Sequence, residues 1–294
     1  MKVQKARLRD YQFIWLVIDD NGAFIIPIQK YIQHLFCLDK SPYTIKSYAH
    51  NLKLYWEFLK KNSFQWNKVT INQIEAFVSW LKRYHSSLAA REDSSMNTIL
   101  SAVIGFYEFH RRFSKISLQL TYHKHSFIQN YPSLLSHVKK NTFTKHRMIK
   151  FRPAKKIPKL ISDETVKAMI HECISIRDKF LIALLYETGM RIGQVLGLRH
   201  QDIHSWNNEV CINPRKDNIN EARAKTIHPY IVHVSPKLMA LYYQSICDLK
   251  EKKTEDYVFL GQPPNRGKPL AYAAVNALFK RLSQKVGIKI TPHL

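Results

Sequence analysis

The apolar residues at the start of the chain repeat with two different periods. Residues 13–26 alternate apolar and polar positions on either side of Asp20-Asn21-Gly22. An Asn-Gly pair tolerates the positive φ angles that a tight hairpin turn requires. The pattern therefore predicts a small β-hairpin within residues 1–27, and a helical period replaces it from about residue 41.

Three amphipathic helices are predicted in the next part of the chain. Ser41 followed by Pro42 is typical of a helix start, because the hydroxyl can accept a backbone N–H and proline suits the first turn. Thr70 and Gln73 have the spacing of a capping box. The apolar face of these helices consists of Ile45, Tyr48, Leu52, Tyr55, Trp56, Leu59, Ile71, Ile74, Phe77, Val78, Leu81, Ile99, Leu100, Val103, Ile104 and Tyr107. Residues 28–115 are therefore expected to form a helical domain.

A linker and a second domain are predicted beyond these helices. Pro153 and Pro158 lie in the segment KFRPAKKIPKL, where proline prevents a helix from continuing. Residues 116–160 are therefore expected to be an extended basic linker. A new helix start near Ser162 opens the second domain, residues 161–294.

The second domain is expected to combine helices with a small β-sheet. Apolar residues from Phe180 to Leu185 predict a buried helix, and Gly189 is a natural end for it. Further elements are predicted as strands at residues 210–212, 231–234 and 258–260, and as a last helix at residues 271–286. The fold class is therefore mainly α, of the α+β kind.

The charge of the chain points to a polyanionic partner. The 294 residues contain 46 Lys and Arg against 22 Asp and Glu, which gives a formal net charge of +24. Residues 109–162 contain no acidic residue but 13 Lys and Arg, interleaved with aromatic residues. Lysines on phosphates release condensed counterions, so salt-dependent binding of nucleic acid is expected. The candidate contacts are Lys46, Lys53, Lys139, Lys140, Lys155 and Lys156.

Other features argue against a membrane or secreted protein and against a metal site. No apolar run approaches the roughly 18 residues that span a bilayer, and the start MKVQKARLRD has no apolar signal segment. The four cysteines are far apart and form no CxxC pair. We therefore expect a cytoplasmic protein without a metal or another cofactor.

The most specific segment is RDKFLIALLYETGMRIGQVLGLRHQDI, residues 177–203. It resembles the first arginine box of the tyrosine recombinases, the phage-integrase family. The resemblance implies that Arg191 binds the scissile phosphate, and a planar guanidinium can donate two parallel hydrogen bonds to such a group. The family often has a carboxylate three residues later. Gln194 occupies that position here, and it can accept a hydrogen bond without supplying charge.

The segment NPRKDNINEARAKTIHPYIVHVSP, residues 213–236, resembles the hairpin that carries the family's lysine. Lys225 fits the spacing best, and the resemblance implies that it is the general acid that protonates the leaving 5′ oxygen. Lys216 is the competing candidate. A solvated loop lysine without a catalytic role is the alternative interpretation of Lys225.

The last residues, KITPHL, resemble the opening of the family's second box, so that His293 matches its first histidine. The second arginine, a later histidine and the tyrosine nucleophile would follow Leu294. The catalytic domain is therefore expected to be incomplete, and this chain alone inactive. Tyr272 precedes the second box, which is the wrong order for the nucleophile, and it is interpreted as a packing or surface residue.

The resemblance extends to the first domain. Residues 41–61 resemble the opening helix of the family's SAM-like core-binding domain, and the similarity as a whole spans residues 28–294. It implies site-specific DNA recombination, integration or transposition on duplex DNA, with self-association on the DNA and no ATP or metal. The hairpin-bearing N-terminus favours the transposase-type integrases of mobile elements.

Three alternatives remain open from the sequence. The first is a non-catalytic duplex-DNA-binding protein derived from a recombinase. The second is an RNA-binding or membrane-surface protein with a chance motif. The third is a type IB topoisomerase, which shares the chemistry, although the helices of the first domain favour a recombinase.

Overall fold

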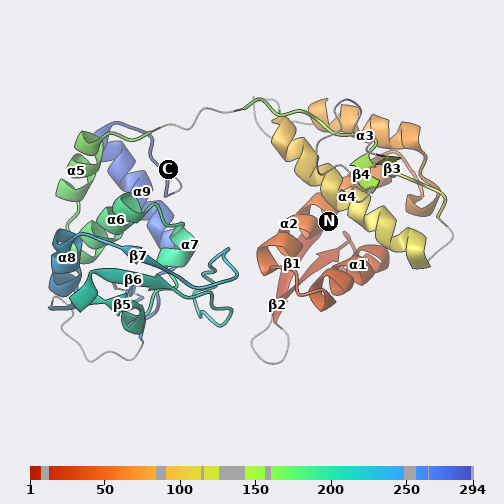
Figure 1. Cartoon of the computed structure of the whole chain (residues 1–294). Helices are drawn as coiled ribbons and strands as arrows, with labels where there is room; N and C mark the ends of the chain where they lie inside the picture. Colours follow the sequence, from red (N-terminus) through yellow and green to blue (C-terminus); the bar gives the residue numbers. More distant parts are fainter. Residues whose placement is uncertain are drawn as a thin grey trace, which may run out of the picture. The chain divides into compact units, whose positions relative to one another are not determined.

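The computed structural model describes residues 1–7, 13–83, 91–113, 116–125, 143–155, 160–247, 256–263 and 265–292. The chain forms two compact units, Met1–Lys155 and Lys156–Leu294 (Figure 1). Each unit has its own apolar core, so each is described by itself.

The first unit consists of four helices and two strand pairs within the described residues. Its elements are β1 (Lys2–Arg7), β2 (Phe13–Ile18), α1 (Ile26–Cys37), α2 (Pro42–Lys61), the short 3₁₀ helix η1 (Trp66–Lys68), α3 (Ile71–Arg83), α4 (Asp93–Phe113), β3 (Thr121–His125) and β4 (Phe143–Arg147). The apolar positions predicted from the helical period form most of its core, where Tyr55 and Tyr107 are fully buried. Their hydroxyl groups are 2.7 Å apart, and Tyr107 also donates to the carbonyl of Trp66 at 2.9 Å. Each buried hydroxyl therefore has a partner.

The predicted helix starts are confirmed. The Ser41 hydroxyl accepts the backbone N–H of Thr44 at the start of α2. The side chain of Gln73 accepts the backbone N–H of Thr70 at 2.9 Å, before α3. Helix α1 was not expected from the pattern, and Pro at its first turn is its sequence signal.

The N-terminal hairpin lies within residues 1–27, but its pairing differs from the prediction. Strand β2 pairs with β1, not with a strand beyond Asn21-Gly22. The turn at Asn21-Gly22 closes a single bridge, between Ile18 and Phe24. Helix α1 begins at Ile26, because burial of Ile25 and Ile28 in the core draws this segment into a helix.

The described part of residues 116–160 differs from the predicted extended linker. Its chain folds back on α4, where β3 and β4 form an antiparallel pair. Lys145 of β4 forms an ion pair with Glu108 at 2.7 Å, and Asn97 exchanges two hydrogen bonds of 2.9 Å with the backbone of Phe151. The buried residues of this segment that join the core of the first unit are Ile116, Leu118 and Leu120. Apolar residues between the lysines, which the charge pattern obscured, explain the difference.

The second unit combines helices with one three-stranded sheet within the described residues. Its elements are α5 (Asp163–His171), α6 (Ile176–Thr188), α7 (Ile192–Val195), η2 (His200–Asp202), β5 (Ile203–His204), η3 (Ser205–Asn207), β6 (Glu209–Ile212), β7 (Tyr230–His233), α8 (Pro236–Cys247) and α9 (Tyr272–Val286). The sheet has the order β5-β6-β7 and is antiparallel throughout. Helix α8 was not expected from the sequence. No named strand forms at the predicted residues 258–260, where isolated bridges occur at Tyr257, just before them, and at Leu260.

Helix α6 ends where the sequence predicts. Ser175 caps its start by accepting the backbone N–H of Asp178, and Gly189 follows its end with φ +61°. This left-handed conformation reverses the chain immediately before Arg191. The end of α6 therefore fixes the position of Arg191 within the arginine box.

Replacing Gly189 by Ala is expected to destabilise the protein by about 1–2 kcal/mol, because a Cβ atom is strained in the left-handed region. No neighbour lies within 4 Å of the added Cβ, so the cost is conformational rather than steric. Gly189→Asn serves as the matched control and should lose less, since Asn tolerates this conformation better. Urea unfolding of the two variants measures the difference; equal stability of Gly189→Ala and the parent chain would contradict it.

Candidate active site

Arg191 lies on the surface of the second unit, at the residue before α7. Its side chain is exposed. Within the described residues, its guanidinium group forms no hydrogen bond and no ion pair. Its hydrogen-bond donors are therefore available to an external anion.

Gln194 supports the backbone of Arg191 rather than its guanidinium. It is 4% exposed, and its Oε1 atom accepts the backbone N–H of Arg191 at 2.8 Å. Its Nε2 atom donates to the hydroxyl of Tyr230, the first residue of β7, at 2.9 Å. Gln194 thus joins the start of α7 to the start of β7, and Tyr230 is a partner that the sequence did not indicate.

Lys225 lies in the long loop between β6 and β7, residues 213–229, and its side chain is exposed. This loop contacts α7 directly. A Cβ atom on Gly193 would lie 2.6 Å from the carbonyl oxygen of Arg223, which is closer than real Cβ contacts allow. Glycine at position 193 therefore permits the loop to pack on α7, two residues from Arg191 on one side and two from Lys225 on the other.

Lys216 is also exposed, but it lies at the other end of the same loop. Its neighbour Arg215 is bound to Asp202, and its neighbour Asp217 forms an ion pair with Arg199 at 3.2 Å. The two candidate lysines are therefore held by different contacts, and it is the Lys225 end of the loop that packs on α7 at Gly193.

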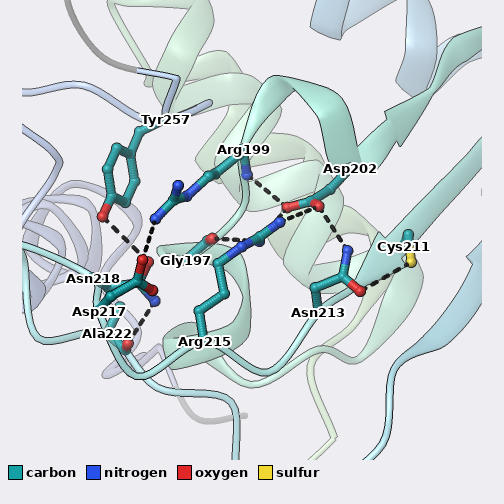
Figure 2. Close-up of polar contacts among 10 residues, drawn as sticks. All are labelled: Gly197, Arg199, Asp202, Cys211, Asn213, Arg215, Asp217, Asn218, Ala222 and Tyr257. Atoms are coloured by element: carbon teal, nitrogen blue, oxygen red, sulfur yellow. Dashed lines mark hydrogen bonds and ion pairs between the residues drawn. The ribbon is translucent and has the colours of Figure 1, made fainter.

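A buried carboxylate holds the start of this loop (Figure 2). Asp202 is 1% exposed. Arg215 donates to both of its oxygens, at 2.6 and 2.7 Å, and Asn213 donates to Oδ1 at 2.8 Å. The backbone N–H of Arg199 donates to Oδ2 at 2.9 Å. Each carboxylate oxygen thus accepts two hydrogen bonds, which is the arrangement that compensates a buried charge.

These contacts determine the charge state of Asp202. Burial by itself would raise its pKa, but the hydrogen bonds from Arg215, the Arg199 backbone and Asn213 outweigh burial and lower it. The pKa of Arg215 is raised by its hydrogen bond to Asp202. The two groups are therefore both charged at neutral pH.

Asparagine side chains hold the middle of the loop. Asn218 donates to the carbonyl of Ala222 at 2.8 Å and accepts from the hydroxyl of Tyr257 at 3.2 Å (Figure 2). Asn220 donates to the carbonyl oxygens of Leu196 and Leu270, at 3.0 and 2.9 Å. The loop is consequently attached to several parts of the second unit despite having no regular structure.

The other predicted site residues lie in the first unit, at the start of α9, or outside the described residues. His293, Lys139, Lys140 and Lys156 lie outside the described residues. In the first unit, Lys46 is exposed, with its ammonium 5.0 Å from the centre of the Trp15 ring, and Lys155 is exposed. Lys53 forms an ion pair with Glu57 at 3.1 Å, which reduces its availability. Tyr272 begins α9 and is partly exposed.

No group of three or more His, Cys, Asp and Glu side chains is arranged to hold a metal ion in the part of the chain that the structure describes. Across the same residues, no helix is both long and apolar enough to cross a membrane.

Comparison with known proteins identifies the family. Residues 28–113 match the phage integrase N-terminal SAM-like domain, and residues 158–294 match the phage integrase family. The chain belongs to the phage integrase family of tyrosine recombinases. The first unit contains the SAM-like core-binding domain and the second contains the catalytic integrase domain, and the predicted fold class is confirmed. Members of this family break and rejoin DNA strands.

Named relatives include transposases and other tyrosine recombinases. This tyrosine recombinase is 35% identical to transposase A from transposon Tn554 of Staphylococcus aureus over 306 aligned positions, which cover 100% of this chain and 84% of that protein. It is 25% identical to tyrosine recombinase XerD of Halalkalibacterium halodurans over 262 residues, which cover 85% of this chain and 74% of XerD.

Solved structures share the fold of this tyrosine recombinase. The Tn1549 transposon integrase, in complex with a circular intermediate DNA, has a TM-score of 0.59 at 13% identity, covering 91% of this chain and 83% of that chain. The XerH recombinase bound to a palindromic difH substrate has a TM-score of 0.57 at 17% identity, and the match covers 85% of this chain and 65% of the XerH chain. At such identities the likeness concerns the fold.

Asp202→Asn is expected to destabilise this tyrosine recombinase at pH 7 by about 3 kcal/mol, because it leaves the Arg215 guanidinium without its buried counter-charge. The pKa of Asp202 is lowered in the folded protein, so its stabilisation is complete above its unfolded pKa and declines as the pH falls through the folded value. Urea unfolding at pH 7 and near pH 3 should therefore show a difference between parent and variant that shrinks in acid. A difference independent of pH would contradict the ion-pair explanation.

Proposed function

We propose that this protein carries out site-specific DNA recombination, as an integrase or transposase, by tyrosine-mediated breakage and rejoining of duplex DNA. The observation that carries the proposal is the exposed, unpaired guanidinium of Arg191 at the start of α7, within the described residues. Beside it packs the loop that bears Lys225. A phosphate clamp and a proton donor are the two groups that the reaction needs from this part of the domain.

The roles follow from the chemistry of a phosphodiester. A tyrosine oxygen attacks the phosphorus, and the bond to the 5′ oxygen breaks, which leaves a 3′-phosphotyrosyl link. Arg191 stabilises the charge that develops on the non-bridging oxygens. Lys225 gives a proton to the departing 5′ oxygen, and His293 assists proton transfer or binds the phosphate. The covalent link conserves the energy of the ester, so rejoining by a 5′ hydroxyl needs neither ATP nor a metal.

Lys225 is preferred to Lys216 because of its place in the loop. Arg223, two residues before Lys225, packs against Gly193 beside Arg191. Lys216 instead lies among the contacts that fasten the loop to Asp202 and Arg199. The same phosphate would therefore be reached more directly from Lys225.

Duplex DNA is the proposed partner. The net charge of +24 favours a polyanionic partner. The exposed lysines Lys46 and Lys155 are suited to phosphate contacts. The other proposed phosphate contacts are Lys53, Lys139, Lys140 and Lys156. The Tn1549 integrase and XerH, which share the fold, were solved with DNA. We further propose that copies of the protein associate on the DNA, and that it acts in the bacterial cytoplasm.

The family's tyrosine follows its second box, which would place it after Leu294. We therefore propose that residues 1–294 alone bind duplex DNA without cutting it. The alternative function is a non-catalytic DNA-binding protein derived from a recombinase. The two functions are distinguished by the full-length protein, which includes any residues that its gene encodes after Leu294. If the alternative is right, the full-length protein also fails to cut DNA.

The binding of residues 1–294 to duplex DNA should weaken steeply with salt. If about six phosphates are contacted, the affinity should fall by roughly 10³-fold between 50 and 200 mM salt, because counterions are released on binding. Fluorescence anisotropy with labelled duplex measures it, and duplex RNA and anionic vesicles are the comparison ligands. An affinity that does not change with salt, or a preference for RNA or vesicles, would contradict the proposed partner.

Arg191→Ala in the full-length protein should reduce covalent protein–DNA adducts by at least 10²-fold, because it removes charge stabilisation in the transition state. Lys225→Ala should slow cleavage strongly, whereas Lys216→Ala, the matched control in the same loop, should not. Adduct formation on a nicked or suicide duplex, resolved on denaturing gels, measures all three. Adducts that persist in Arg191→Ala would contradict the assignment of Arg191 as the phosphate clamp.

A further inference from the structure

We propose that Asp202 and Arg215 are positioning residues for the strand-cleavage reaction. Their ion pair holds the β6–β7 loop on the second unit, so that Lys225 is presented beside Arg191. The inference rests on the proposed function, because it concerns the same lysine and the same arginine. It assigns to Arg215 an internal role that its sequence context does not suggest.

Arg215 is turned inward. It belongs to the basic run Pro-Arg-Lys, in which an arginine would ordinarily be taken for a phosphate contact. Its side chain is only 15% exposed, and its two terminal nitrogens both donate to Asp202. One of them also lies 3.5 Å from the carbonyl oxygen of Gly197. Its charge is therefore neutralised within the protein and is not available to DNA.

Asp202 joins three segments of the chain. It receives the backbone N–H of Arg199, the amide of Asn213 at the end of β6, and the guanidinium of Arg215 in the loop (Figure 2). Arg199 lies four residues after Val195, the last residue of α7, while Asn213 and Arg215 open the loop. One buried carboxylate thereby fixes the start of the loop to the last residues of the arginine box.

Beyond this start, the loop runs back along the arginine box. Asn220 binds the carbonyl of Leu196, immediately after α7, and Arg223 then packs on Gly193. A Cβ atom on Gly197 would lie 2.9 Å from the side chain of Asn218, so this approach is also close. From Arg215 to Arg223 the loop thus follows the box in reverse, from Asp202 toward Arg191. A shift at the start of the loop would be transmitted to Lys225.

The chemical consequence concerns proton transfer. A general acid acts only within hydrogen-bond reach of the oxygen that it protonates. A displacement of about 1 Å can slow an enzymatic reaction by roughly 10²-fold. Lysine has a long, flexible side chain, so the backbone that carries it must supply much of the precision. A loop without regular structure needs fixed attachments to do so.

The test compares two leaving groups in the full-length protein. Cleavage of ordinary DNA expels a 5′ oxygen, which needs a proton. Cleavage of DNA with a bridging 5′ sulfur expels a thiolate, which needs none. Arg215→Lys keeps the charge but loses the two parallel hydrogen bonds, and Asp202→Asn keeps the shape but loses the charge. Both variants should cleave ordinary DNA roughly 10- to 10²-fold more slowly. With the sulfur-containing DNA they should cleave within a few-fold of the parent.

Glu172→Gln is the matched control. It removes an ion pair of 2.9 Å with Lys285, on the surface of the same unit and away from the loop, and should leave both rates unchanged. Trypsin digestion of residues 1–294 supplies a second measurement, since the loop contains Arg215, Lys216, Arg223 and Lys225. Cleavage within the loop should be faster in Arg215→Lys than in Glu172→Gln when both are folded.

The outcomes separate this inference from the proposed function. Equal slowing of both DNA substrates in Arg215→Lys, or no slowing of either, would overturn the positioning role. If Lys225→Ala is restored by the sulfur substrate and Arg215→Lys is not, the inference fails while the role of Lys225 stands. If Lys225→Ala is not restored, the proposed general acid itself is wrong. Arg215→Lys decides the matter even if Asp202→Asn does not fold.

Discussion

The catalytic unit depends on a carboxylate that the fold has removed from water. An isolated charge at the position of Asp202 would be very costly, so the surrounding chain must bring donors to it. Arg199 supplies a donor from the segment before the sheet, and Asn213 and Arg215 supply donors from the start of the loop between β6 and β7. Satisfying one buried group therefore fixes the relative positions of the arginine box, β6 and the loop that follows.

Burial also distinguishes two arginines that look alike in the sequence. Arg191 lies in the segment Thr-Gly-Met-Arg and Arg215 in the segment Asn-Pro-Arg-Lys, and the sequence alone allows either guanidinium to contact a phosphate. Arg215 is enclosed with a carboxylate, which raises its pKa and occupies its donors. The Arg191 side chain is exposed, and its guanidinium forms no hydrogen bond or ion pair within the described residues. One guanidinium is thus structural, and the other retains the capacity to bind a phosphate.

The first unit illustrates a different balance between charge and burial. The stretch from residue 109 to 162 has no acidic residue, and charge repulsion within it favours an extended chain. Its first apolar residues nevertheless join the helical core, and Glu108, directly before the stretch, binds Lys145 of β4. A few buried side chains and one ion pair outweigh repulsion between charges that water screens.

Local patterns determined much of this protein. The helix caps at Ser41, Ser162 and Ser175, the left-handed Gly189 and the family's arginine box depend on residues that are neighbours in the chain, so they can be recognised without a structure. The hairpin pairing, the packing of residues 116–125 and 143–151 on α4, and the partners of Gln194 and Asp202 join residues far apart in the sequence. Only the tertiary structure decided these, because burial and contact distance are properties of the packed chain. For the same reason, the sequence offered Lys216 and Lys225 as alternatives without showing that the loop packs on Gly193 through Arg223, two residues before Lys225.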